Sequence, residues 1–316
     1  RCSFRPFVKR GLGVKSKALL FLKGVAMGAA DVVPGVSGGT IAFITGIYDE
    51  LLTALSRIPE AAWLLLQGQV KRAWQLANVN FLLILFSGIL LSILSLARLI
   101  TWLLETQPIA LWSFFFGLIL VSCYLVARDI QRWHLSRWLS FVVGAGFAWW
   151  ITVAAPVVWG TDPLSLFAAG AIAICAMILP GVSGSFILLL MGLYPTVLLA
   201  VKQLDVSVLM VFAAGCLFGL LAFARVLRAA LQHFRDLTLA LLTGVMFGSL
   251  NKVWPWKSTL SWRIDSHGSE VPLLQKNISP WQFADMFQSN AQLLPALLLM
   301  LIGVVSVIGI ERYAGK

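Results

Sequence analysis

Long apolar segments separated by short polar connections dominate this chain. An apolar run of about 20 residues can cross the hydrocarbon core of a bilayer as a helix. The pattern therefore predicts an all-α integral membrane protein with five apolar segments in each half. The segments lie at about 16–33, 36–56, 79–104, 109–127 and 138–159, and then at about 166–179, 183–201, 206–231, 236–251 and 291–311.

The two halves of the sequence are related by an internal repeat. The motif Pro-Gly-Val-Ser-Gly at 34–38 recurs at 180–184, an offset of 146 residues. Further along the chain an offset of 127 residues aligns Arg98 with Arg225. The offset changes because the loop at 57–78 is longer than its counterpart in the second half. Two copies of a five-residue motif in the same order with so many matched glycines indicate a duplicated unit.

Each repeat, 1–165 and 166–316, is predicted to open with a re-entrant helical hairpin followed by three transmembrane helices. The stretch 167–179 spans roughly 20 Å as a helix, too short for a hydrocarbon core of roughly 30 Å. Since three crossings are an odd number, the second repeat enters from the opposite side, as in many secondary transporters. Two full crossings in place of each hairpin return the chain to the same side and stay an alternative. The hairpins span about 16–56 and 166–201, with turns at Pro34, Gly35, Pro180 and Gly181.

Composition excludes an ordinary soluble enzyme. Apolar residues make up 59% of the chain and charged residues 12%, about half the charged share of soluble domains. The three histidines and four cysteines show no metal-binding spacing, and no catalytic Ser/His/Asp set or phosphate-binding glycine loop is present in the sequence. We therefore expect no enzyme activity, no metal, no cofactor and no disulfide.

The distribution of the net charge of +11 predicts an orientation. Basic residues gather in the N-terminal segment, in alternate short loops and near Arg312, which is the positive-inside pattern of cytoplasmic N- and C-termini rather than a nucleic-acid footprint. The long loop at 251–290 escapes that rule, and its tryptophans suit an interfacial belt. The loop cations are Arg57, Lys71, Arg72, Arg128, Arg132, Arg137, Arg228 and Arg235, and the belt tryptophans are Trp254, Trp256, Trp262 and Trp281.

The two Pro-Gly turns are candidate anion sites. A helix that begins after such a turn directs free N–H groups and a positive dipole end towards the middle of the bilayer, where they suit a phosphate. The alternative is that the turns are helix punctuation with small residues for close packing. Two inverted copies that meet at the midplane favour a ligand site. The candidate phosphate-binding residues are Ser37, Gly38, Gly39 and Thr40 in the first turn, and Ser183, Gly184 and Ser185 in the second.

Three charged residues inside apolar segments add to this site. Arg98 and Arg225 occupy equivalent positions of the repeat, and a guanidinium binds phosphate through two hydrogen bonds. Snorkelling to the membrane surface is the alternative for each arginine. Asp31 precedes the first turn and is a candidate for the coupling ion. Its alternatives are an ion pair with Lys23 or an arginine, or a hydrogen bond to a turn N–H.

Several long motifs resemble those of the family labelled domain of unknown function 368, described as bacterial polyprenyl-phosphate (undecaprenyl-phosphate) transporters. The resemblance covers roughly 20–255 and implies a flippase that returns undecaprenyl phosphate from the outer to the cytoplasmic leaflet of the inner membrane. It implies a polyprenyl-phosphate lipid as substrate, with a proton or sodium ion as coupling partner. A homo-oligomer is compatible with the sequence but not specified by it. The motifs lie at 24–40, 46–48, 115–118, 173–186, 248–250 and 254–256.

Two other functions are compatible with repeats and re-entrant helices. An integral-membrane polyprenyl pyrophosphate phosphatase needs an acid, base or nucleophile at the midplane, and no His or Glu is predicted there. An ion-coupled transporter of small anions needs no lipid specificity. Phosphate release from a pyrophosphate lipid, or strong competition by soluble phosphate, distinguishes these alternatives from lipid transport.

Overall fold

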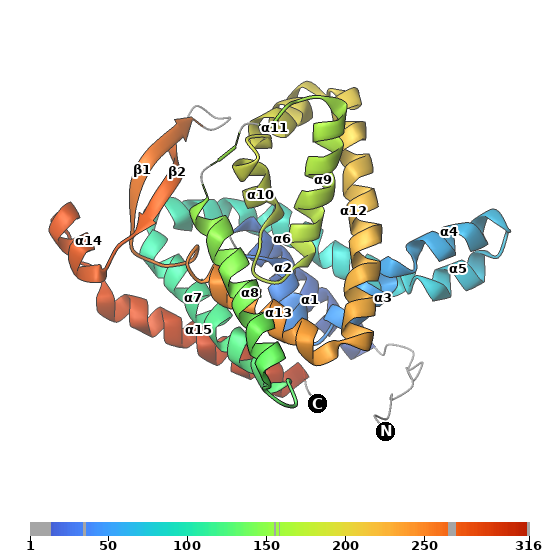
Figure 1. Cartoon of the computed structure of the whole chain (residues 1–316), viewed down its shortest axis with the longest axis horizontal. Helices are drawn as coiled ribbons and strands as arrows, with labels where there is room; N and C mark the ends of the chain where they lie inside the picture. Colours follow the sequence, from blue (N-terminus) through green and yellow to red (C-terminus); the bar gives the residue numbers. More distant parts are fainter. Residues whose placement is uncertain (1–13, 34–35, 155, 158, 265–269, 315–316) are drawn as a thin grey trace.

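The computed structural model describes residues 14–33, 36–154, 156–157, 159–264 and 270–314. Within these residues the protein is mostly helical, with one two-stranded sheet (Figure 1). The first half contains α1 (Val14–Val32), α2 (Gly38–Ile44), α3 (Tyr48–Ser56), α4 (Ile58–Leu66), α5 (Val70–Leu76), α6 (Val79–Thr106), α7 (Pro108–Arg128) and α8 (Leu135–Val153). The second half contains α9 (Pro163–Ile178), α10 (Gly184–Leu190), α11 (Tyr194–Gln203), α12 (Val206–His233), α13 (Arg235–Ser249), β1 (Lys257–Ile264), β2 (Glu270–Asn277), α14 (Pro280–Phe287) and α15 (Leu293–Ala314).

Four helices in the described part of the chain are long and apolar enough to cross a membrane. They are α6, α7, α12 and α15, and the bent pair α10–α11 is a fifth candidate. Only 11% of the α12 span and 17% of the α15 span is buried inside the protein. Such apolar surface is stable against lipid rather than water. The prediction of a mainly helical multi-pass membrane protein is therefore confirmed.

The second apolar segment of each half is two helices rather than one. The predicted continuous segments 36–56 and 183–201 break at Gly46 and Gly192, with φ of +71° and +70°. This left-handed conformation suits glycine, which has no Cβ to clash with the following carbonyl. In the second half the two helices meet at 109°. The expectation of unbroken return segments was wrong, although the breaks occupy equivalent positions of the sequence repeat.

Glycines bring the helices into close contact, and the contacts recur between the halves. A Cβ at Gly24 of α1 would lie 2.3 Å from the Leu85 carbonyl oxygen of α6. At the aligned position of α9, a Cβ at Gly170 would lie 2.4 Å from the Phe212 carbonyl oxygen of α12. The pairs α1–α6 and α9–α12 therefore pack through the same sequence positions, at a distance that excludes a side chain.

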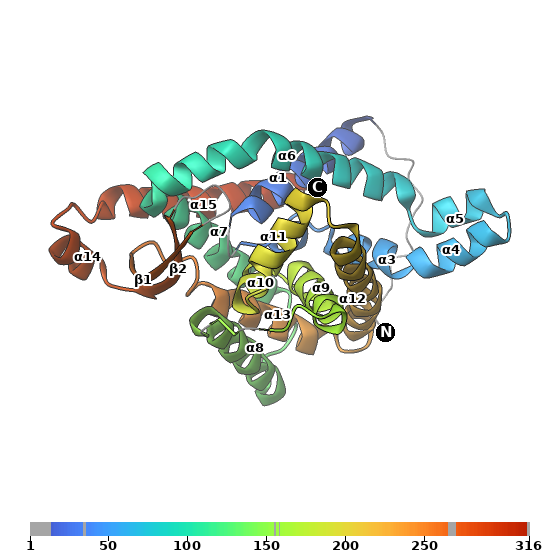
Figure 2. The same cartoon turned by 90° about the horizontal axis from the view of Figure 1, so that it is seen from above.

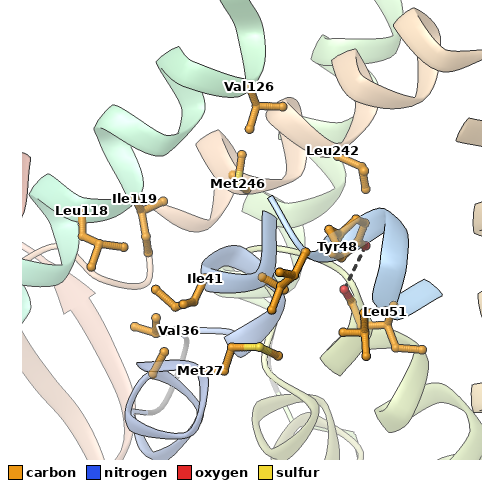
Figure 3. Packing of buried hydrophobic residues seen from close by; sticks show 14 of the residues in the cluster. Met27, Val36, Ile41, Tyr48, Leu51, Leu118, Ile119, Val126, Leu242 and Met246 are labelled. Carbon is orange, nitrogen blue, oxygen red and sulfur yellow. Dashed lines mark hydrogen bonds between the residues drawn. The ribbon is translucent and has the colours of Figure 1, made fainter. Parts of the chain in front are cut away.

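The last helix of each half packs against the other half. A Cβ at Gly303 of α15 would lie 2.3 Å from the Phe114 carbonyl oxygen of α7, and one at Gly144 of α8 would lie 2.3 Å from the Leu241 carbonyl oxygen of α13. Figure 2 shows α15 beside α7, and Figure 1 shows α8 beside α13. This exchange interlocks the halves around one main apolar core, part of which is drawn in Figure 3.

The connections predicted to share one side of the membrane contact one another. The Arg228 guanidinium donates to the Ser56 hydroxyl at 3.1 Å, which joins α12 to the end of α3. Ion pairs also join these connections, and we call this group of loops the ionic face. The pairs are Arg235 with Asp49 at 3.9 Å, Arg137 with Asp236 at 3.6 Å, and Arg128 with Glu311.

The loop at 251–290 folds into a substructure that the sequence analysis did not predict. Strands β1 and β2 pair antiparallel, with Lys257 opposite Asn277 and Ile264 opposite Glu270, and α14 follows them. This unit lies at the far end of the molecule from α4 and α5 (Figures 1 and 2). Of the predicted belt tryptophans, Trp262 and Trp281 are exposed. Trp256 is 2% exposed and donates to the Ala291 carbonyl, so its assignment to the belt was wrong.

Candidate functional site

The two Ser-Gly turns meet in the interior of the protein. The backbone N–H of Gly181 donates to Thr40 Oγ1 at 3.0 Å. Ser37 Oγ lies within donating distance of the Leu179 carbonyl oxygen, at 3.1 Å, and Tyr48 donates its hydroxyl to the Ile178 carbonyl at 3.0 Å (Figure 3). The second turn therefore rests on α2 and α3 through hydrogen bonds that link the two halves. The predicted turn residues Pro34 and Gly35 lie outside the described residues.

Gly181 allows this contact. Its φ of +92° lies in the left-handed region, and a Cβ there would lie 2.9 Å from Met246 Cα and from Ser249 Oγ. A side chain at this position therefore collides with α13 and is also strained in its backbone. The Pro-Gly sequence of the second turn is thus explained by close packing on α13 as well as by the turn itself.

Most polar groups of the first turn already have partners. Asp31 Oδ1 accepts the Gly38 N–H at 2.7 Å, and Ser37 Oγ accepts the Gly39 N–H at 3.1 Å. Ser37 and Thr40 are buried, at 1% and 0% exposure. A carboxylate therefore occupies the position at the start of α2 that an external anion would take. Asp31 matches the hydrogen-bond alternative, whereas Lys23 donates to the Thr45 carbonyl at 2.7 Å.

The second turn differs because its residues line a cavity. Met177 stands at the position equivalent to Asp31, so no carboxylate faces the start of α10 from that position. Ser183 Oγ and Ser185 Oγ lie 2.9 Å apart, and Ser185 is exposed. The free volume is about 10 Å³, space for about one water molecule, so a phosphate enters only if the walls move apart. The lining residues are Ala148, Ile151, Thr152, Gly181, Val182, Ser183, Phe186, Ser249 and Lys252.

Lys252 gives the cavity wall a positive charge. Its Nζ lies 4.2 Å from the centre of the Phe186 ring, within cation–π distance. Lys252 follows α13, outside the spanning helices, and burial lowers the pKa of its ammonium to about 8. A desolvated cation that shares a cavity with the Ser183 hydroxyl is suited to bind a phosphate. Lys252 was not among the predicted site residues, because it belongs to a long loop whose path the pattern of apolar segments does not determine.

The turn that carries Lys252 is held on three sides. Asn251 donates its amide to Thr152 Oγ1 at 2.7 Å, and Asn277 of β2 donates to the Asn251 carbonyl at 2.7 Å. The Lys257 ammonium donates to the Lys252 carbonyl at 2.6 Å and lies 4.1 Å from the centre of the Trp112 ring. The sheet β1–β2 therefore positions the cation at the end of α13.

The structure does not bring the two predicted arginines to the turns. Arg98 on α6 and Arg225 on α12 are both exposed, and neither lines the Lys252 cavity. Arg225 instead lines a separate groove with residues of α4 and α5. Their roles as phosphate ligands stay predictions. The helices after the turns, α2 and α10, have seven residues each, so their dipoles are short and side chains carry most of the site's charge.

Comparison with known proteins assigns the chain to a family. The sequence profile described as undecaprenyl phosphate translocase-like matches residues 27–271. The chain belongs to this family. The matched range of this chain includes both turns, Lys252 and strand β1, and the family resemblance expected from the motifs is confirmed.

Two relatives of this chain are named polyprenyl-phosphate transporter. The one from Vibrio cholerae is 53% identical over 297 residues, which cover 94% of this chain and 96% of the relative. The one from Staphylococcus aureus is 34% identical over 259 residues, which cover 76% of this chain and 87% of the relative. No solved structure matches the chain.

Proposed function

We propose that this protein is a flippase, not an enzyme, that returns undecaprenyl phosphate from the outer to the cytoplasmic leaflet of a bacterial inner membrane. Its substrate class follows from the names of its relatives. The observation that carries the proposal is the contact between the two turns, Gly181 to Thr40, beside a cavity lined by Lys252. The prenyl tail is soluble in lipid, so the protein needs a polar path for the phosphate alone.

The architecture we propose is an inverted repeat, 1–165 and 166–316, in which each half opens with a re-entrant hairpin. The matched glycine contacts of α1–α6 and α9–α12 support the repeat. The ionic face, which contains the positive-inside loops, is assigned to the cytoplasm together with both termini. Helices α8 and α13 run from Arg137 and Arg235 at this face to the Lys252 cavity, over about 20 Å. The cavity then faces the outer leaflet.

In the proposed mechanism the second turn binds the phosphate first. Ser183 and Lys252 offer a hydroxyl and an ammonium in the cavity, and Ser185 adds a second hydroxyl 2.9 Å from that of Ser183. Gly184 lets the start of α10 pack closely on the Ala173 carbonyl, which holds these side chains in place. The first turn, at 37–40, holds the closed state through its bonds to the second. Opening breaks these bonds, which frees Ser37 and Thr40 to contact the headgroup as it crosses. Because the closed cavity holds about one water molecule, it is an occluded state.

Cation coupling completes the proposal. Inward movement of one negative charge against an inside-negative potential costs about 2.3 kcal/mol per 100 mV. A proton or sodium ion that moves with the phosphate offsets that cost. Asp31 is the candidate carrier because its carboxylate lies at the first turn, where opening breaks contacts with the second. Protonation of Asp31 weakens its acceptance of the Gly38 N–H and links the ion to the opening.

A vesicle assay tests this function. Purified protein is reconstituted with fluorescent undecaprenyl phosphate, and a membrane-impermeant quencher reports how much lipid remains in the outer leaflet. We expect Lys252→Met to slow transfer about 10- to 100-fold, the loss of a charge-assisted contact. Lys17→Met, at an exposed position on α1, is the matched control. Equal rates in the wild type, Lys252→Met and Ser183→Ala contradict the proposed site.

A further inference from the structure

The hairpin α4–α5 distinguishes the two halves. It occupies 58–76, whereas the equivalent connection in the second half, between α11 and α12, consists of Leu204 and Asp205. The hairpin extends away from the rest of the molecule in both views (Figures 1 and 2). A feature found in one half alone makes the two ends of an otherwise repeated transporter different. Its position next to the ionic face associates it with one leaflet.

A groove separates this hairpin from α12. The groove is shallow and widely open, with a volume of about 420 Å³. The wall is mostly apolar, with an indole and two leucines, and Arg225 lies opposite them on α12. The lining residues are Pro59, Glu60, Trp63, Leu64, Leu76 and Arg225.

The charge around the groove is positive. Arg225 lines the groove itself. Arg57 immediately precedes the hairpin, and Arg228 lies three residues after Arg225 on α12, so their two positive charges are close to each other at this end of the groove. The Nε of Arg228 is buried without a hydrogen-bond partner among the described residues. Glu60 opposes them with one negative charge, so an anion is favoured at this end of the groove.

The outer surface of the hairpin suits a lipid environment. Leu66 and Val70 are 82% and 57% exposed, whereas Lys71 and Arg72 provide its charged edge. An amphipathic element of this kind lies at the boundary between headgroups and acyl chains. The groove therefore opens to the membrane, where its occupant carries an apolar chain and an anionic head.

We infer that this groove is the cytoplasmic docking site for polyprenyl phosphate. The Arg225 guanidinium binds the phosphate through two hydrogen bonds, and the first isoprene units lie along Trp63, Leu64 and Leu76. The equivalent Arg98 lines neither this groove nor the Lys252 cavity, so docking in this form is restricted to one leaflet. The inference rests on the proposed function, because it takes the same lipid as its ligand.

Site-specific photocrosslinking tests the groove. Benzoylphenylalanine is placed at Leu64, which lines the groove, or at Leu66, which does not, in the full chain reconstituted in phosphatidylcholine vesicles. The probe is radiolabelled undecaprenyl phosphate. We expect labelling through position 64 to exceed labelling through position 66 about tenfold, and Arg225→Gln to remove that excess. Arg132→Gln, at an exposed position of the loop after α7, retains that excess. Arg225→Lys retains part of it, because lysine keeps the charge but cannot donate two parallel hydrogen bonds to the phosphate.

Three results overturn the inference. They are equal labelling through positions 64 and 66, equal labelling by the uncharged polyprenol, and complete displacement of the label by phosphatidylglycerol at equal mole fraction. The last result identifies a site for bulk anionic lipid. If the protein transports the lipid but position 64 is not labelled more than position 66, the docking site is refuted and the proposed function is retained. If position 64 is labelled selectively but the wild-type protein does not transport the lipid, the proposed function is refuted and the groove is retained as a lipid-binding site.

Discussion

Gly181 and Thr40 join the two halves of the protein through one hydrogen bond, 3.0 Å from the Gly181 nitrogen to Thr40 Oγ1. Both residues are buried, and each belongs to one copy of the repeated turn. Any movement that separates the turns must break this bond. Its strength therefore contributes to the balance between the occluded state and an open one.

Thr40→Val is expected to destabilise the closed state. Valine has nearly the same shape but no acceptor, so the buried Gly181 N–H loses its partner at a cost of about 1–3 kcal/mol. We expect a lower midpoint of thermal unfolding in detergent, measured by tryptophan fluorescence. Thr40→Ser keeps the hydroxyl and is the control. A wild-type midpoint in Thr40→Val shows that the bond contributes nothing to stability.

Two glycines of α8 provide a matched test of helix packing. A Cβ at Gly144 would lie 2.3 Å from the Leu241 carbonyl oxygen, whereas nothing lies within 4 Å of one at Gly146. Gly144→Ala is expected to lower stability by about 1–3 kcal/mol, because α8 and α13 must separate. Gly146→Ala is expected to be neutral or to raise stability by up to about 1 kcal/mol. Denaturation of both variants measures the difference, and similar effects refute the interlocked packing of these helices.

The lowered pKa of Lys252 predicts a loss of ligand affinity at alkaline pH. Burial lowers the pKa of its ammonium from 10.5 to about 8, and phosphate binding requires the charged form. With respect to this group, affinity is therefore full well below pH 8, is about halved near pH 8 and falls by up to about tenfold per pH unit above it. Lys252→Arg stays charged and is expected to retain its affinity at pH 9. Equilibrium binding of radiolabelled polyprenyl phosphate measures both, and a parallel decline in wild type and Lys252→Arg excludes titration of Lys252 as the cause.

The same pKa shift has the opposite sign for folding. Because the folded state releases the Lys252 proton more readily than the unfolded chain, this group raises stability as the pH increases from about 8 to 10.5. Lys252→Met is expected to flatten that rise. Thermal unfolding across this pH range measures the slope, and an unchanged slope in Lys252→Met contradicts the shift.

Asp31→Asn is expected to retain the fold but to uncouple transport from a cation gradient. The Asn side-chain oxygen accepts the Gly38 N–H in place of the carboxylate, yet it neither binds a proton nor pairs with sodium. Lipid transfer is measured with and without an imposed proton or sodium gradient. Asp31→Met copies the equivalent Met177, removes both charge and acceptor, and is expected to be less stable. Gradient dependence equal to wild type in Asp31→Asn assigns the ion elsewhere.

The helices were predictable because their apolar segments are continuous and their ends are marked by charge or proline. The predicted segments 79–104 and 206–231 correspond to α6 at Val79–Thr106 and α12 at Val206–His233. The breaks at Gly46 and Gly192 were not predicted, because a glycine inside an apolar run is compatible with a helix until its neighbours are known. The sheet β1–β2 was missed for a related reason, since Lys257–Asn277 has a mixed pattern within a long loop.

The sequence by itself determined the membrane class, the repeated turns and the family, because hydropathy, motif identity and charge asymmetry are properties of residues in order. Only the tertiary structure decided which residues at equivalent positions of the repeat have the same partners and surroundings. Asp31 occupies the first turn while Met177 leaves the second without a carboxylate, and Lys252 reaches the second turn from a loop that is distant in sequence. Burial, partners and charge at a site depend on what packs against it, and a repeat in the sequence does not repeat those neighbours.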